Sequence, residues 1–102
     1  MAYEVEWAES AIVSLVEAID YVSKASPSYA AALAMAADRV GLSLADFPDR
    51  GRRVTEFDDP SVRELPVGSY RLIYRVRPAR VSILAFVHGS RDLAGLLKNS
   101  EQ

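Results

Sequence analysis

The chain has 102 residues, of which half are hydrophobic and a quarter are charged, and this composition predicts one globular domain over residues 1–102. Cysteine is absent and His88 is the only histidine, which excludes disulfides and thiolate chemistry and predicts neither a metal site nor a cofactor. A net charge of -2, from 12 basic and 14 acidic side chains, excludes a whole-molecule field that attracts nucleic acid.

The first elements predicted are a strand at residues 3–7 and a helix that starts near Glu9. Apolar and acidic residues alternate through residues 3–7, which is the period of a half-buried strand. Beyond Glu9 the apolar residues recur at helical spacing, so the helix should be amphipathic. These apolar residues are Ile12, Leu15, Val16, Ile19 and Val22.

A second helix is predicted to begin at Ser26 and Pro27 and to end before Pro48. A serine cap satisfies free amide groups, and proline is tolerated at the first helical position. Many alanines allow this helix to pack closely against the first one, although Gly41 lies within it. Its apolar positions are Tyr29, Leu33, Ala37, Val40 and Leu44.

The second half of the chain is predicted to be a loop, three strands and a short tail helix. Residues 49–60 are polar and form a connecting loop, in which two aspartates before Pro60 suggest an acidic turn. Strands are predicted at residues 62–66, 69–77 and 81–88, separated by Val67-Gly68 and by Pro78-Ala79. The tail at residues 92–97 carries leucines at helical spacing.

This order of elements predicts an α+β fold. An N-terminal strand and a helical hairpin precede a three-stranded antiparallel meander, and the helices should cover one face of the sheet. Functional side chains are then expected on the uncovered face.

Alternation along the last two strands predicts which side chains reach that face. Tyr70, Leu72, Tyr74 and Val76 should point into the core, and Arg71, Ile73 and Arg75 should point away from it. A turn near Pro78 places Phe86 opposite Arg71, so that His88 shares the face of Arg71 and Arg75. With Arg91 these groups could form one shallow site for phosphate or carboxylate. A slip of one residue would instead make His88 a core residue.

Basic side chains are concentrated in the second half of the chain. Nine arginines lie between residues 50 and 91, whereas Lys24 and Arg39 are the only basic residues before Phe47. No apolar run is long enough to span a membrane, and the acidic N-terminus differs from a signal peptide. The protein is therefore expected to be soluble and cytoplasmic.

Two segments are similar to the RelE/ParE family of bacterial toxins. They are Glu64-Leu-Pro-Val-Gly-Ser-Tyr-Arg-Leu-Ile-Tyr-Arg-Val76 and Ile83-Leu-Ala-Phe-Val-His-Gly-Ser-Arg-Asp-Leu93. The resemblance implies a growth-inhibiting toxin that is silenced by a cognate antitoxin, which would be acidic and carry a DNA-binding N-terminal part. RelE-like members cleave mRNA on the ribosome, and ParE-like members poison DNA gyrase.

For RNA cleavage, the resemblance places Arg71 and Arg91 where RelE-like enzymes hold the scissile phosphate, and His88 could supply a proton-transfer group. Glu56 or Glu64 could supply a second such group. The lysines of those enzymes match Val62 and Glu64 here, however, and their C-terminal tyrosine matches Leu97. Because RNA binding depends on phosphate contacts, these departures and the net negative charge favour the gyrase alternative.

The gyrase alternative needs no catalytic residue, and Arg71 and Arg91 could then be structural. A third alternative is an inactive relative that only binds its antitoxin. For binding to the antitoxin or the target, the candidate residues are Arg63, Arg75, Arg77, Leu93 and Leu97.

Overall fold

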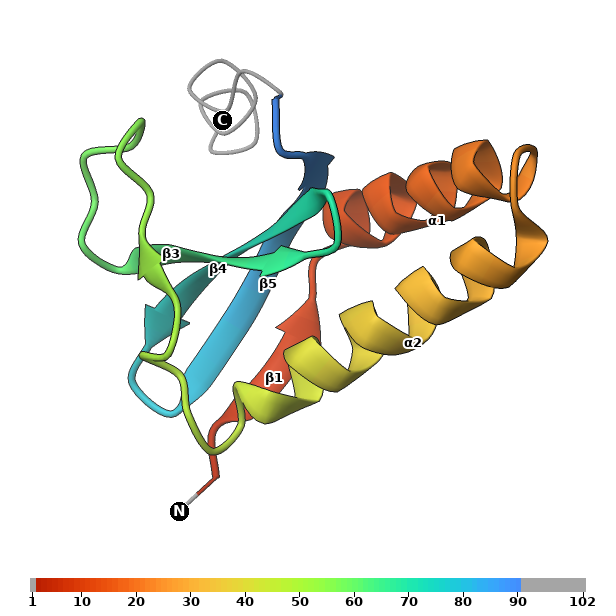
Figure 1. The fold of residues 1–102 in the computed structure, drawn as a ribbon. Coiled ribbons are helices and arrows are strands. Elements are labelled where there is room, and N and C mark those ends of the chain that lie inside the picture. The colour runs from red at the N-terminus through yellow and green to blue at the C-terminus, as the bar shows by residue number, and fades with distance from the viewer. Residues whose placement is uncertain (1, 91–102) are drawn as a thin grey trace.

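The computed structural model describes residues 2–90 and places a helical hairpin against one face of a five-stranded sheet (Figure 1). The elements are β1 (Glu4–Trp7), α1 (Glu9–Ser23), α2 (Pro27–Ser43), β2 (Arg52–Arg53), β3 (Val62–Val67), β4 (Tyr70–Arg77) and β5 (Arg80–His88). The strand order is β1-β5-β4-β3-β2, in which β1 runs parallel to β5 and the other pairs are antiparallel. The predicted α+β class is confirmed. None of the helices in residues 2–90 is long and apolar enough to cross a membrane.

Helix α1 packs against the sheet through small side chains. In α1 the buried residues are Ala11 and Ala18, whereas Ile12 and Val16 are 49% and 60% exposed. The alanines bring the helix close to β5, so the side of α1 that carries Ile12 and Val16 stays in solvent. As predicted, Ser26 caps α2, where its Oγ accepts a hydrogen bond from the Tyr29 amide at 3.2 Å.

Gly41 lies in α2 because the helix passes very close to the sheet there. A Cβ atom at this position would lie 3.3 Å from both the Trp7 ring and Ile83 Cδ1. The glycine that weakens the helical pattern therefore fits α2 against β1 and β5.

The segment predicted as a loop at residues 49–60 contains the short edge strand β2. Arg52 pairs with Glu64 and Arg53 pairs with Arg63 of β3. A strand of two residues has no periodicity that a sequence pattern could detect, so the prediction of an uninterrupted loop was wrong.

The β4–β5 hairpin contains a bulge that changes the predicted register. Arg77 pairs with Arg80 across the predicted turn, but Tyr74 pairs with Ile83 and Ile73 pairs with Ala85, which leaves Leu84 as the extra residue. Beyond the bulge every partner is shifted by one position. Phe86 consequently lies opposite Leu72 rather than Arg71, and His88 lies opposite Tyr70.

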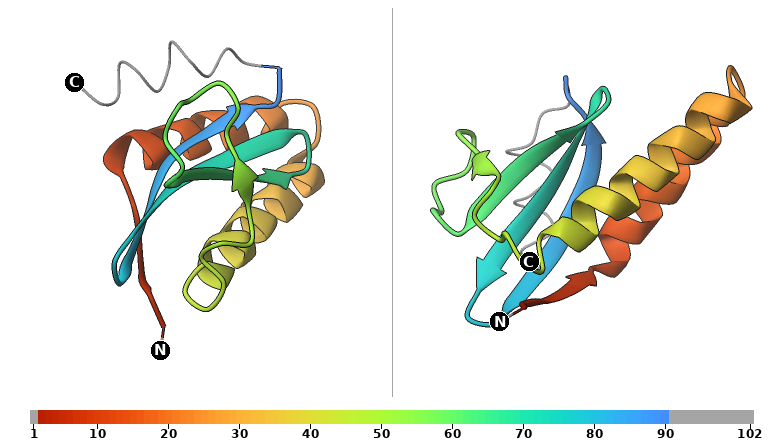
Figure 2. Two further views of the ribbon diagram at one scale, coloured as in Figure 1. Left: turned by 90° about the vertical axis from the view of Figure 1, so that its left-hand side faces the viewer. Right: turned by 60° about the horizontal axis from the view of Figure 1, so that its bottom comes forward.

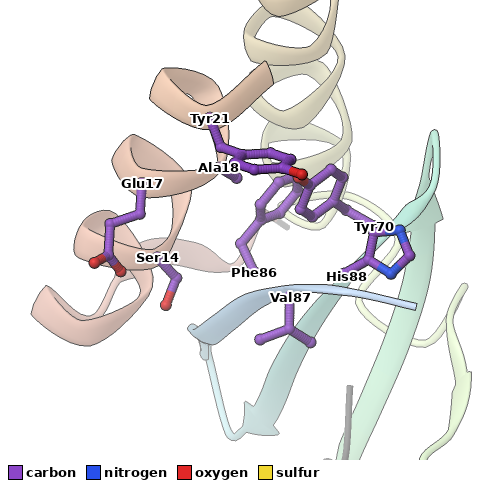
Figure 3. A pocket seen from close by; sticks show the side chains of 8 residues that line it. All are labelled: Ser14, Glu17, Ala18, Tyr21, Tyr70, Phe86, Val87 and His88. Atoms are coloured by element: carbon purple, nitrogen blue, oxygen red, sulfur yellow. The ribbon is translucent and has the colours of Figure 1, made fainter. Parts of the chain in front are cut away.

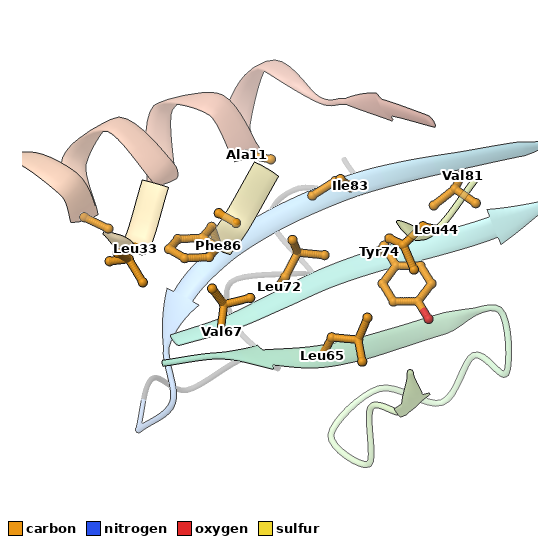
Figure 4. Packing of buried hydrophobic residues seen from close by; sticks show 12 residues of the cluster. Ala11, Leu33, Leu44, Leu65, Val67, Leu72, Tyr74, Val81, Ile83 and Phe86 are labelled. Atoms are coloured by element: carbon orange, nitrogen blue, oxygen red, sulfur yellow. The ribbon is translucent and has the colours of Figure 1, made fainter. Parts of the chain in front are cut away.

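The core consists of two apolar layers, one on each face of the sheet. The larger layer lies beneath the helices and includes Leu33, Leu72, Tyr74 and Phe86, as Figure 4 shows. Figure 2 shows from two further sides how the helices and the 54–61 segment lie around the sheet. A smaller layer on the other face packs Val54 and Phe57 of that segment over apolar residues of β3, β4 and β5. The face expected to be open is therefore partly covered.

Candidate functional site

Arg71 of β4 forms a bidentate ion pair with Glu64 of β3 on the face opposite the helices. Pro66 is the direct partner of Arg71, and Glu64 lies two residues along the same strand face. Arg71 Nη2 donates to Glu64 Oε2 at 2.9 Å, and its Nε donates to Oε1. The Arg71 side chain is 14% exposed and that of Glu64 is 4% exposed, so solvent screens this pair weakly.

Two further charged side chains complete this group. Glu56 accepts hydrogen bonds from Arg71 Nη1 at 3.1 Å and from Nη2 at 3.3 Å, and Arg52 Nε lies 3.5 Å from Glu64 Oε2. We call Arg52, Glu56, Glu64 and Arg71 the Arg71 cluster. Its formal charge is zero, because two guanidinium groups face two carboxylates.

Hydrogen bonds within the Arg71 cluster stabilise the charged forms of Arg71 and Glu56. Hydrogen bonds to Glu64 and then to Glu56 raise the pKa of Arg71 above its already high ordinary value. The hydrogen bonds from Arg71 lower the pKa of Glu56. The cluster lines a shallow depression of about 410 Å³ together with Thr55 and Ser69. An anion entering it would have to displace carboxylates that already occupy the Arg71 guanidinium.

Neighbouring arginines fasten residues 49–61 to the sheet. Arg75 Nη2 lies 3.4 Å from Asp59 Oδ2, and Arg63 Nη1 donates to the Gly51 carbonyl at 2.7 Å. Asp59 also accepts hydrogen bonds from the Ser61 hydroxyl at 2.7 Å and the Ser61 amide at 2.9 Å, which lower its pKa. Of the three arginines predicted to contact a partner, Arg63 and Arg75 are thus held within the protein, and Arg77 is exposed at the end of β4.

Gly51 is a structural residue that sequence reasoning missed, and so is its contact with Tyr74, which is buried as predicted. The Gly51 amide donates to the Tyr74 hydroxyl at 2.9 Å, and a Cβ atom on Gly51 would lie 2.5 Å from that oxygen and 2.6 Å from the Glu64 carbonyl. No side chain fits there, so the chain enters β2 beside Glu64 only with glycine at this position. A glycine in a polar loop gave no sequence signal for this contact.

His88 lies on the helix side of the sheet, away from Arg71 and Arg75. Its ring meets that of Tyr70 edge-on at 5.5 Å, and Tyr70 stacks on Phe86 at 5.1 Å. Figure 3 shows His88 lining a pocket with these rings and with α1 residues. The prediction that His88 shares a face with Arg71 was wrong, because the bulge at Leu84 reverses the side on which His88 emerges.

The other predicted site residues lie outside the described part of the chain. Arg91, Leu93 and Leu97 fall within residues 91–102. Within residues 2–90, no group of three or more His, Asp or Glu side chains could hold a metal ion. Of the predicted catalytic residues, only Arg71 lies on this face within residues 2–90, where Glu64 and Glu56 are its partners.

Comparisons with known proteins agree with the fold. A family described as ParE toxin of type II toxin-antitoxin system, parDE, matches residues 5–93. No curated protein sequence matches the chain. A solved chain of the chromosomal ParDE toxin-antitoxin system from P. aeruginosa is 20% identical, with a TM-score of 0.68 over 85% of this chain and 96% of that one. A chain of the toxin-antitoxin complex RelBE2 from Mycobacterium tuberculosis is 24% identical, with a TM-score of 0.58 over 86% and 99%. At these identities the two structures support the fold alone.

Breaking the Arg71–Glu64 pair on one side should destabilise the protein strongly. Arg71→Met leaves the Glu64 carboxylate buried beside a neutral side chain, with an expected cost of about 3–5 kcal/mol in the free energy of unfolding. The double variant Arg71→Met/Glu64→Met removes both charges and should recover most of this loss. Urea denaturation measures both, with Lys24→Ala as the control, because it breaks an ion pair with Asp20 whose side chains are 74% and 72% exposed. Equal instability of the single and double variants would contradict the assignment.

Stability should fall in acid because the carboxylates that hold residues 49–61 must then be protonated. The pKa values of Asp59 and Glu56 lie below their ordinary values of 3.8 and 4.5. Their stabilising contribution is complete above those ordinary values and is lost as the pH falls through the lowered values. Asp59→Asn should therefore make the decline below about pH 4 shallower. Asp58→Asn, at an exposed neighbour, is the control, and an equal effect of the two substitutions would argue against the Asp59 contacts.

Proposed function

Because the chain belongs to the ParE toxin family of type II toxin-antitoxin systems, we propose that it stops bacterial growth by binding DNA gyrase and that a cognate antitoxin silences it. The observation that carries the choice of target is the state of Arg71. Its guanidinium group is occupied by Glu64 and Glu56, so it is unavailable to hold the scissile phosphate of an RNA.

Within residues 2–90, the groups beside Arg71 that could transfer a proton for RelE-like cleavage of mRNA are carboxylates already paired with its guanidinium. Such a reaction needs a base for the 2'-hydroxyl, a stabiliser for the negative phosphorane and an acid for the leaving oxygen. His88 emerges on the opposite face, and the Glu64 and Glu56 carboxylates accept the hydrogen bonds of Arg71. A phosphate placed here would face two carboxylates at close range, which is repulsive.

Binding a protein target makes none of these demands. It requires an accessible surface and not a basic phosphate-binding groove, and the net charge of -2 does not oppose it. A neutral Arg71 cluster then has a structural role in holding β3, β4 and the 54–61 segment together.

The proposed antitoxin is an acidic protein with a DNA-binding N-terminal part. The two solved relatives are described as a toxin-antitoxin system and a toxin-antitoxin complex, which supports a partner of this kind. Among the arginines proposed for this contact, Arg77 is exposed, whereas Arg63 and Arg75 bind Gly51 and Asp59. We expect Arg77 to contribute most of the three.

Induced expression of the chain without antitoxin tests the target directly. Pulse labelling of DNA and protein during the first minutes should show DNA synthesis stopping before translation, followed by filamentation. Translation stopping first would contradict the proposal and favour mRNA cleavage. No effect on either process would indicate an inactive relative that only binds its antitoxin.

The paired variant Arg71→Met/Glu64→Met separates a structural Arg71 from a catalytic one. If Arg71 is structural, the folded double variant should inhibit growth as strongly as the unsubstituted chain. Circular dichroism and antitoxin binding establish that it is folded. Loss of toxicity in a folded, antitoxin-binding double variant would assign Arg71 a direct role in toxicity and contradict this account.

A further inference from the structure

We propose that the pocket between α1 and the ends of β4 and β5 binds the guanidinium group of an arginine side chain presented by a partner protein. We call it the aromatic pocket, and the residues that carry the argument are Glu17, Tyr21, Tyr70, Phe86 and His88. It lies on the helix side of the sheet, away from the Arg71 cluster, and the inference does not depend on whether gyrase is the target.

Aromatic rings line one side of the pocket. Tyr70 and Phe86 are parallel to within 6°, with ring centroids 5.1 Å apart, and His88 meets Tyr70 at 81°. Tyr21 extends from α1 over these rings, as Figure 3 shows, although its side chain is 73% exposed. Phe86 is 2% exposed and stacks on Tyr70, so the exposed Tyr21 ring is the face on which a planar guanidinium group can stack. The electron-rich face of an aromatic ring attracts cations.

Charge selects a cation and disfavours an anion. Glu17 lines the pocket one helical turn before Tyr21, and no lysine or arginine of the described residues lines it. The exposed surface of α1 adds Glu9 and Asp20, and Lys24, which follows the helix, is paired with Asp20 at 3.7 Å. Phosphate or nucleic acid would therefore be repelled here, whereas a guanidinium group can stack on Tyr21 and reach the Glu17 carboxylate.

An exposed apolar side chain beside the pocket, Val13, favours a cation that belongs to a protein. Ile12, Val13 and Val16 are 49%, 51% and 60% exposed on α1. Val13 is one helical turn before Glu17 and continues the wall of the pocket along α1, whereas Ile12 and Val16 lie toward the other side of the helix. A protein segment that presents an arginine could also cover Val13, which a small free cation could not do.

An NMR titration of the full chain tests the pocket with defined probes. Nα-acetyl-arginine amide should shift the resonances of Tyr21, Tyr70 and His88 at millimolar concentrations. The citrulline counterpart has the same shape without the charge and should bind about fivefold more weakly. Tyr21→Ala and Glu17→Gln should each weaken arginine binding by a similar factor, and Phe47→Ala, at an exposed residue outside the pocket, should not.

Three outcomes would overturn the proposal. Equal binding of citrulline would show that the positive charge is not recognised, and equal binding of putrescine would indicate a general cation site. Unchanged arginine binding by the Tyr21→Ala and Glu17→Gln variants would place the probe elsewhere on the protein.

Discussion

Arg71 and Glu64 form an ion pair on the face of the sheet opposite the helices, and neither side chain is well exposed to water. Taking two charges out of water is costly, so such a pair persists only when its geometry is good and its remaining hydrogen-bonding atoms are satisfied. Here Glu56 accepts further hydrogen bonds from Arg71, and Arg52 forms an ion pair with Glu64. The pair links β3 to β4 and, through Glu56, attaches the segment between β2 and β3. The chemistry available on this face therefore depends on it.

The extra residue Leu84 in β5 places His88 on the opposite face of the sheet from Arg71. The bulge at Leu84 turns Phe86 and His88 toward the helices, where Phe86 joins the main core and His88 borders the aromatic pocket. Without it, His88 would have emerged beside Arg71. The protein consequently has a neutral group of ion pairs on one face of the sheet and the aromatic pocket, lined by Glu17, on the other.

Sequence patterns predicted the elements whose signal is local. The order of elements, the Ser26 cap and the alternation along β4 all depend on residues close together in the chain. The register beyond Leu84 was not predictable, because a bulge leaves the apolar pattern of β5 almost unchanged. The pairing of Arg71 with Glu56 and Glu64 was also missed. Glu56 lies 15 residues and Glu64 lies 7 residues before Arg71 in the chain, and the three side chains meet only when the sheet forms.

The central claim is that Arg71 stabilises the sheet and does not bind a scissile phosphate. The most direct measurement adds the purified chain to a reconstituted translation reaction and maps the mRNA ends by primer extension. The account predicts that the transcript stays intact while ribosomes translate it. New ends within codons at the ribosomal A site, absent with a folded Arg71→Met/Glu64→Met variant, would contradict it and establish this face as a ribonuclease site.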